Sequence, residues 1–393
     1  MALGDLRVLD LTRVIAGPFC TGLLADFGAE VIKVELPGRG DDTRYGYPTV
    51  ADVPVAFLAL NHNKKGITLD VRKPAGRELL LKLIDRCDVL VENFAAGTME
   101  KWGLGYEVLR ARHPRLIYAA LSGFGQTGPY AHRTSYDIIA QAMGGLMSLT
   151  GFPDGPPTRG GGALGDYIGG LFLAVGILTA VHFRAQSGQG QLVDVSNMDA
   201  MFTILDSWPT VTAMTGRLPA RLGNRHPFTA PYDCYRATDG YVVIGVANNQ
   251  LFRTLVTAVG RPELGQDVRF KSPRARLEHH DEINGVIGGW VGCRTVAEVM
   301  RVLGAANVPC APVMTVDQLL TDPQLRARDM VVQAPHPQIG PVTMPGVPIK
   351  LSASPGAVRA VGPGLGQDNE AVYRDLLGLS AAEISALQAE QVI

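Results

Sequence analysis

Cysteine is scarce in this sequence of 393 residues, which holds only five. The five lie far apart and form no CxxC pair, so the sequence gives no support to a zinc ribbon or a thioredoxin-like redox site. We expect all of them to be buried free thiols in a reducing cytoplasm. They are Cys20, Cys87, Cys234, Cys293 and Cys310.

An excess of charge of one sign is also missing, because 36 Lys and Arg residues are balanced by 37 Asp and Glu residues. A nucleic-acid-binding protein usually carries a basic excess, and a polybasic membrane patch needs clustered Lys and Arg. The most apolar segment, residues 167–181, contains glycines and is shorter than the roughly 20 residues of a membrane span. The N-terminus lacks the basic and apolar regions of a signal peptide. We therefore predict a cytoplasmic protein that binds neither nucleic acid nor membranes.

Motifs of several well-known chemistries are absent. The sequence has neither the GxxxxGK[ST] spacing of a phosphate loop nor the GxSxG turn of a serine hydrolase. His279 and His280 have carboxylates beside them, but adjacent side chains point apart, so a solvated surface is expected there rather than a metal site. The sequence therefore predicts no metal centre.

The first half of the chain alternates strand-like and helix-like segments. This order predicts an α/β fold, in which a large Rossmann-like domain holds a parallel sheet. The expected strands are residues 6–11, 31–35, 67–71, 89–91, 116–121 and 191–195, and the expected helices are residues 18–27, 78–86, 135–149 and 166–184. The last two helices are apolar on most faces, so both are expected to be buried.

The texture of the sequence changes after about residue 201. We predict a large domain from residues 1–205 plus 330–393 and a smaller α/β domain from residues 226–318. Two long linkers, residues 206–225 and 319–329, would join them. The smaller domain is expected to begin with a hairpin that turns at Asp239-Gly240.

Residues 159–170 form the sharpest local feature, since six of the twelve are glycine. Glycine lets a ligand approach the main chain closely. Asp166 stands where the next helix is expected to begin, and the positive end of a helix would keep its carboxylate ionised and stabilise an oxyanion on it. From this segment alone, an ordinary helix cap is the simpler interpretation, because Asp is among the commonest caps.

The whole chain resembles a known family. Ten segments carry the resemblance, among them LRVLDLTRVIAGPF (6–19), NHNKKGITLDVR (61–72), DVLVENFAAGTMEKWGL (88–104) and GALGDYIGG (162–170). The succession of AGP, NKK, VENF and GD is similar to the class III CoA-transferases, whose relatives include formyl-CoA:oxalate transferase, the carnitine CoA-transferases and the 2-methylacyl-CoA racemases.

The resemblance implies that Asp166 is the nucleophile, which forms an acyl-aspartyl anhydride and then an aspartyl-CoA thioester. CoA is then a substrate, and neither a tightly bound cofactor nor a metal is required. The resemblance also implies an interlocked homodimer. Positions that match the family's CoA site are Ile15, Ala16, Leu69, Arg72, Asn93, Phe94, Lys101 and Tyr136. Leu36 stands where formyl-CoA transferase has an arginine, so that phosphate contact is either missing or supplied by Arg39.

The substrates remain open among several alternatives. Segments 40–44, 223–226 and 246–252 look like those of succinate, glutarate and itaconate transferases, which predicts succinyl-CoA as donor and a dicarboxylate as acceptor. A dicarboxylate needs a cation for its far end, and Arg44, Arg159 and Arg225 are the candidates. A racemase is a second interpretation, but Tyr136-Asp137 replaces its His-Asp pair, and tyrosine is a poor base at neutral pH. A non-catalytic acyl-CoA-binding protein on the same scaffold is a third.

Overall fold

A computed structural model describes residues 1–46 and 48–393 of the chain. The chain divides into two compact units, each described here by itself. Unit 1 comprises Met1–Leu146, Arg159–Gly216 and Pro323–Ile393, and unit 2 comprises Met147–Thr158 and Arg217–Asp322. The domain limits and the interlocked homodimer stay predictions; sedimentation of the purified chain would test the dimer.

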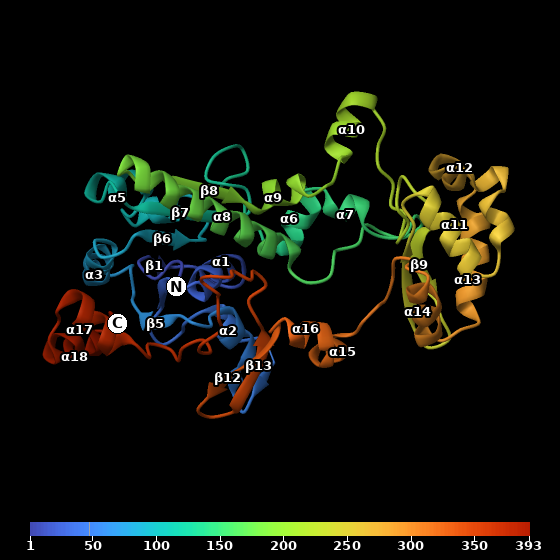
Figure 1. Cartoon of the computed structure of the whole chain (residues 1–393). Helices are drawn as coiled ribbons and strands as arrows, with labels where there is room; N and C mark the ends of the chain where they lie inside the picture. Colours follow the sequence, from blue (N-terminus) through green and yellow to red (C-terminus); the bar gives the residue numbers. More distant parts are fainter. Residues whose placement is uncertain (47) are drawn as a thin grey trace. The chain divides into compact units, whose positions relative to one another are not determined.

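Unit 1 is built on a parallel sheet of six strands within the described residues, in the order β5-β2-β1-β6-β7-β8 (Figure 1). In sequence order these strands are β1 (Arg7–Asp10), β2 (Glu30–Glu35), β5 (Lys65–Thr68), β6 (Val89–Glu92), β7 (Ile117–Ser122) and β8 (Leu192–Ser196). The predicted parallel sheet is confirmed. The chain moves outward in one direction through β2 and β5 and in the other through β6, β7 and β8. The order therefore reverses between β1 and β6, where doubly wound sheets open a crevice for ligands.

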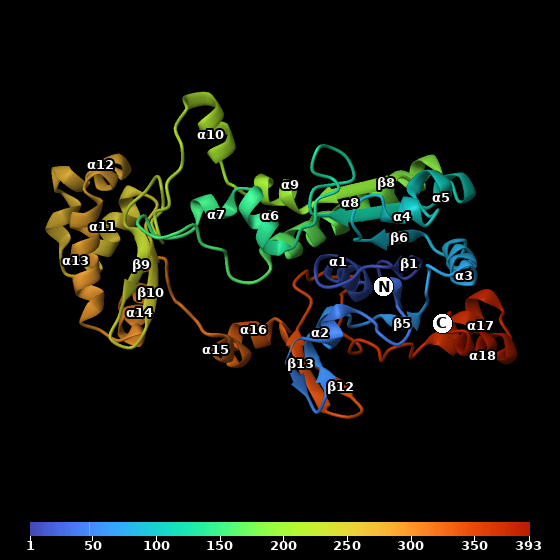
Figure 2. The ribbon, with the colours of Figure 1, turned by 180° about the vertical axis from the view of Figure 1, so that it is seen from behind.

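Apolar residues alternate along the strands and bury against helices on both faces of this sheet. One face, which includes Leu9, Ile32 and Leu90, packs against α3 (Pro74–Ile84), α5 (Tyr106–Arg112), α17 (Asn369–Leu377) and α18 (Ala381–Ala389). The other face, which includes Val8, Val31 and Val89, packs against α1 (Ala16–Asp26) and α8 (Leu164–Ser187). The C-terminal α17 lies beside α3 and β5, as Figure 2 also shows from behind.

Helix α8 is long and apolar enough to span a membrane by length and composition. Its residues Leu173 and Ile177 are fully buried against one face of the parallel sheet, so it is a core helix of unit 1. The expectation that the helix is buried on most faces is wrong, however, because Leu171, Phe172, Val175 and Leu178 on its other side are exposed in the single chain. Within the described chain, β7, β8 and α1 cover only one side of it.

Unit 2 has an antiparallel sheet of order β11-β10-β9, made of β9 (Tyr232–Arg236), β10 (Tyr241–Gly245) and β11 (Cys310–Pro312). The predicted hairpin is present, and Ala237 N–H donates to Gly240 O across its turn. The apolar core of the unit lies between this sheet and its helices. These helices include α11 (Asn249–Ala258), α12 (Pro273–Glu278), α13 (His280–Gly292) and α14 (Val296–Ala305).

The remaining elements are shorter. They are α2 (Val55–Leu60), α4 (Thr98–Lys101), α6 (Asp137–Met143), α7 (Leu146–Leu149), α9 (Asn197–Thr203), α10 (Trp208–Thr215), α15 (Val316–Thr321), α16 (Pro323–Ala327), the hairpin β12 (Val331–His336) with β13 (Gly340–Pro345), and the pair β3 (Thr49–Val50) with β4 (Val53–Pro54). The short 3-10 turns are η1 (Asp42–Arg44), η2 (Pro262–Gly265) and η3 (Val268–Phe270).

Three local expectations need correction. The helix predicted over residues 135–149 is two helices, because Gly145 has a φ of 93° that interrupts it between α6 and α7. The predicted linker 206–225 contains helix α10, which Pro209 helps to start. All five cysteines are free as predicted, but only Cys20 and Cys87 are buried, whereas Cys293 is exposed.

Candidate active site

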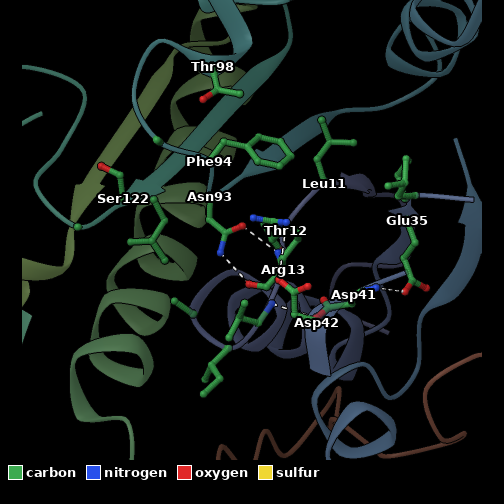
Figure 3. Close-up of a pocket in the computed structure, with 18 of the residues that line it drawn as sticks. Leu11, Thr12, Arg13, Glu35, Asp41, Asp42, Asn93, Phe94, Thr98 and Ser122 are labelled. Atoms are coloured by element: carbon green, nitrogen blue, oxygen red, sulfur yellow. Dashed lines mark hydrogen bonds and ion pairs between the residues drawn. The ribbon is translucent and has the colours of Figure 1, made fainter. Parts of the chain in front are cut away.

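A cavity of about 620 Å³ opens in unit 1 along the carboxyl edge of the parallel sheet. Each strand of the sheet contributes the residues that follow it or its last residues. They include Leu11–Ala16 after β1, Glu35 and Leu36 at the end of β2, Leu69–Arg72 after β5, Asn93–Ala95 after β6, Ser122 and Gly123 at β7, and Asn197 after β8. Ligands of doubly wound sheets bind at this edge, so the topology itself places the site. Figure 3 shows several of these residues around the opening.

Asn93 joins the loops that follow β1 and β6 on the two sides of the crevice. Its Oδ1 accepts from Arg13 N–H at 2.8 Å, and its Nδ2 donates to Arg13 O at 2.8 Å, so one side-chain amide joins the two loops (Figure 3). The preceding Glu92 accepts from Phe94 N–H at 2.7 Å and fixes the same turn. Phe94 packs edge-on against Trp102, with ring centroids 5.1 Å apart. The VENF motif (91–94) therefore forms part of one wall of the cavity, where these contacts fix its turn.

Fully buried charges lie beneath the loop after β1. Lys64 Nζ donates to Asp10 Oδ2 at 3.0 Å, and Lys33 Nζ donates to Asp41 Oδ2 at 2.9 Å. Lys33 also donates to Thr12 O at 2.9 Å, so the network holds the main chain that lines the cavity. Burial by itself would raise the pKa of Asp10, but Lys64, Lys33 and two threonine hydroxyls lower it to about 2. The NKK motif (63–65) thus supplies Lys64 as the buried counter-ion of Asp10.

Asp166 lines the same cavity, in the first turn of α8. The helix begins at Leu164, two residues earlier than predicted, so Asp166 is its third residue and not its cap. Asn197 Nδ2 donates to Asp166 Oδ1 at 3.2 Å. Burial, followed by the nearby Asp137 carboxylate, raises the pKa of Asp166 to about 6 against this hydrogen bond. The expected strengthening of its ionisation by the helix end is therefore outweighed.

Asp137 takes the place at the helix end that the sequence assigns to Asp166. Its Oδ1 accepts from Gly165 N–H at 2.8 Å, at the start of α8. Gln141 Nε2 and Arg159 Nε donate to its Oδ2 at 2.9 and 3.2 Å. A buried carboxylate at a helix N-terminus satisfies free N–H groups and meets positive potential. The carboxylate of Asp166 is thereby left with fewer contacts than that of Asp137.

Most residues predicted for CoA line the cavity. Ile15 and Ala16 begin α1, Leu69 and Arg72 follow β5, and Tyr136 has 75% of its surface exposed at the start of α6. Arg72 is held by Asp70 through two bonds of 2.8 Å, while its side chain stays 60% exposed. Leu36 and Arg39 line the cavity too. Lys101, the last residue of α4, is not part of the lining that the described residues form.

The three candidate arginines for a second carboxylate lie in different surroundings. Arg44 is bound to Glu35 at 2.7 and 2.8 Å and stacks on Phe57, and Arg159 braces the glycine-rich loop through Gly162 O and Asp137. Neither is part of the described cavity lining. Arg225 lies in unit 2, where it pairs with Asp281 at 2.9 Å and lines a separate cavity of about 430 Å³.

Arg13, Arg133 and Asn197 are among the polar residues of the lining that sequence reasoning missed. A signal for Asn197 was available, because a polar residue directly after the last strand of a parallel sheet reaches the carboxyl edge. Arg13 and Arg133 add positive charge to the cavity, which suits a ligand that carries phosphates.

Comparison with known proteins identifies the family. The model of CoA-transferase family III matches residues 3–369. The chain belongs to this family. It is therefore a class III CoA-transferase, and the predicted resemblance is confirmed.

Two curated members of the family are similar along most of their length. Succinyl-CoA–D-citramalate CoA-transferase of Chloroflexus aurantiacus is 42% identical over 393 residues, which cover 100% of this chain and 98% of that protein. Acetyl-CoA:oxalate CoA-transferase of Acetobacter aceti is 42% identical over 348 residues, 88% of each chain. The crystal structure of a CAIB/BAIF family protein from Brucella suis has 37% identity and a TM-score of 0.85, and the match covers 95% of this chain and 99% of that one. The fold of this CoA-transferase is thus that of its family.

Proposed function

We propose that the enzyme transfers CoA from succinyl-CoA to a small dicarboxylic acid, through covalent intermediates on Asp166. The observation that carries the proposal is the position of the Asp166 carboxylate, which lines the cavity at the carboxyl edge of the sheet. The Chloroflexus relative, named for succinyl-CoA and D-citramalate, supports both the donor and the acceptor class.

The reaction needs no external energy source. An Asp166 oxygen attacks the carbonyl carbon of succinyl-CoA, the C–S bond breaks, and CoA leaves as the thiolate. The thiolate then attacks Asp166 Cγ, the bond from Cγ to the attacking oxygen breaks, and succinate leaves. The acceptor carboxylate reverses these two steps and departs as its CoA thioester. The Asp166 carboxylate is regenerated and the CoA sulfur ends in the acceptor's thioester, so thioester energy is conserved.

The cavity's own residues support this sequence of steps. Four arginines line the cavity, namely Arg13, Arg39, Arg72 and Arg133, and guanidinium groups are suitable partners for the phosphates of CoA. Glycines before α8 let the thioester approach Asp166 closely. A racemase would need a positioned base pair, and no histidine lines the cavity in the described part of the chain.

An acceptor screen tests the substrate class. Purified enzyme is incubated with succinyl-CoA and, separately, D-citramalate, itaconate, glutarate and oxalate, and new CoA thioesters are identified by mass spectrometry. We expect transfer to at least one of the dicarboxylates with four or more carbons. If none of these acids accepts CoA while another donor and acceptor pair does, the substrate class is wrong even though the family is right.

The pH dependence of Asp166 acylation follows from its raised pKa of about 6. The carboxylate is the nucleophile, and it is deprotonated above this pH and protonated below it. We expect the initial rate of acylation by succinyl-CoA to be level above about pH 7 and to fall about tenfold per pH unit below 6. Rapid-quench mass spectrometry measures this rate. A midpoint near pH 4 would show that burial does not shift the group.

A further inference from the structure

Asn197 brings a hydrogen-bond donor to the Asp166 carboxylate. It is the first residue of α9, directly after β8, and only 7% of its surface is exposed. The 3.2 Å bond from Nδ2 to Asp166 Oδ1 is the single hydrogen bond to that carboxylate within the part of the chain that the structure describes. Asp166 Oδ2 therefore has no hydrogen-bond partner among the described residues, and Asp166 lines the cavity.

The space for this amide exists because residue 169 is glycine. Gly169 lies one helical turn after Asp166, on the same side of α8. A Cβ atom at Gly169 would lie 2.0 Å from Asn197 Oδ1, so any side chain there would displace the amide.

Asn197 Oδ1 is itself buried and has no hydrogen-bond partner among the described residues. A buried acceptor without a partner is unfavourable, because it loses its hydrogen bond to water and gains none in return. Turning the amide round would not remove the problem, because an oxygen would then face the carboxylate of Asp166. The side-chain amide of Asn197 thus has one hydrogen bond within the described chain, which its Nδ2 donates to Asp166 Oδ1.

We propose that Asn197 is a catalytic residue that binds Asp166 Oδ1 and stabilises the oxyanion formed on it when the CoA thiolate attacks Cγ. This inference rests on the proposed function. Oδ2, the unpartnered oxygen, attacks the donor thioester and becomes the bridging oxygen of the anhydride. Oδ1 stays behind as the carbonyl oxygen, still in contact with Asn197 Nδ2.

In the second step, negative charge develops on Asp166 Oδ1, to which Asn197 Nδ2 already donates a hydrogen bond. As the S–Cγ bond forms, the carbonyl electron pair moves to Oδ1. The collapse of this intermediate breaks the Cγ–Oδ2 bond, and the donor acid leaves with Oδ2. A donor aimed at a developing oxyanion is worth about 10²- to 10³-fold in rate.

Other charged groups near α8 do not supply this donor. On α6, Asp137 is an acceptor and is bound by Arg159. On β8 and α9, Asp194 and Asp199 are further acids, and Asp194 accepts from Gln126 N–H. On α1, Asp26 is paired with His62. Asn197 is neutral, so it donates a hydrogen bond to the oxyanion without forming an ion pair with the resting carboxylate.

The test compares Asn197→Ala and Asn197→Asp with the natural enzyme, with succinyl-CoA as donor. We expect kcat to fall about 10²- to 10³-fold in both variants, with KM for succinyl-CoA changed by less than about threefold. Because the second step is slowed, a single turnover should accumulate succinyl-aspartyl enzyme and free CoA at the expense of the aspartyl-CoA thioester. The acid limb of the pH profile should also move upward, since a bond that lowers the pKa of Asp166 is lost. A purely structural role would not change the ratio of the two intermediates.

A double-mutant cycle tests the geometry independently. Gly169→Ala should slow transfer about as much as Asn197→Ala, because the new methyl group displaces the amide. In the Asn197→Ala background the same change should have little further effect. Gly176→Ala, on the same helix, is the matched control. Its new Cβ would lie 2.6 Å from Val193 Cγ1 on β8, and neither residue belongs to the described cavity lining. We expect kcat of this variant to stay within about twofold.

The outcomes separate this inference from the function beneath it. If the natural enzyme forms no adduct on Asp166, the proposed function fails. If it does, and both Asn197 variants keep kcat and the intermediate ratio within about threefold, the role of Asn197 is overturned. Should Asn197→Ala fail to fold, Asn197→Asp decides, because it nearly preserves the shape and replaces the N–H donor by a carboxylate that repels the oxyanion.

Discussion

Asp166→Asn is expected to abolish CoA transfer, with a loss of about 10³-fold or more in kcat, while the fold remains intact. An amide cannot form the anhydride, so no covalent intermediate can follow. The fold should tolerate the change because Asp137, and not Asp166, satisfies the start of α8 through Gly165 N–H. Peptide mass spectrometry after incubation with succinyl-CoA and hydroxylamine measures the adduct, and thermal unfolding measures the fold.

Asp137→Asn provides the contrast for this experiment. It weakens the contacts with Gly165 N–H and Arg159, so it should lower the melting temperature more than Asp166→Asn does. It should nevertheless leave an adduct on Asp166. If Asp166→Asn still forms a covalent succinyl or CoA adduct at another residue, the nucleophile has been assigned to the wrong side chain.

Asp10→Asn is expected to cause the largest loss of stability among the predicted variants, about 3–5 kcal/mol. Asp10 and its partner Lys64 are fully buried, and Lys33 lies close enough to lower the pKa of Asp10 as well. Asparagine has nearly the same shape, so the change removes one negative charge and leaves two buried ammonium groups under-compensated. Urea unfolding followed by circular dichroism measures the difference in unfolding free energy.

Asp85→Asn is the matched control. Asp85 also pairs with a cation, Arg112, but both side chains are about two-fifths exposed. Exposed pairs of this kind contribute about 0–1 kcal/mol. If Asp10→Asn destabilises the protein no more than Asp85→Asn, the buried network does not hold the loop after β1 in the way its geometry indicates.

The sheet was predictable because its strands carry an unusually direct signal. Strands buried on both faces are continuous apolar runs, and residues such as Val89–Val91 have no competing helical pattern. The antiparallel hairpin of unit 2 was marked by its Asp-Gly turn. Helix ends were less predictable, as α8 shows, because a cap can come from a distant residue. Asp137 lies 28 positions before the Gly165 N–H to which it binds.

The exposed side of α8 shows a different limit. An apolar pattern indicates that a surface is to be covered, but it does not say by what. Leu171, Val175 and Leu178 lie on a face that the described chain leaves open. The apolar pattern was therefore interpreted correctly, but the predicted burial of the helix does not hold for this side of it in the single chain.

The succession of strands along the first half of the chain and the family were determined by the sequence alone, since they depend on residue types and their spacing. The tertiary structure decided which side chains share the cavity. It paired Asn197 with Asp166 across 31 positions, gave the helix end to Asp137, and engaged Arg44 with Glu35 and Phe57. Such pairings depend on where elements cross in space, and a short polar side chain carries no local mark of the partner it will meet.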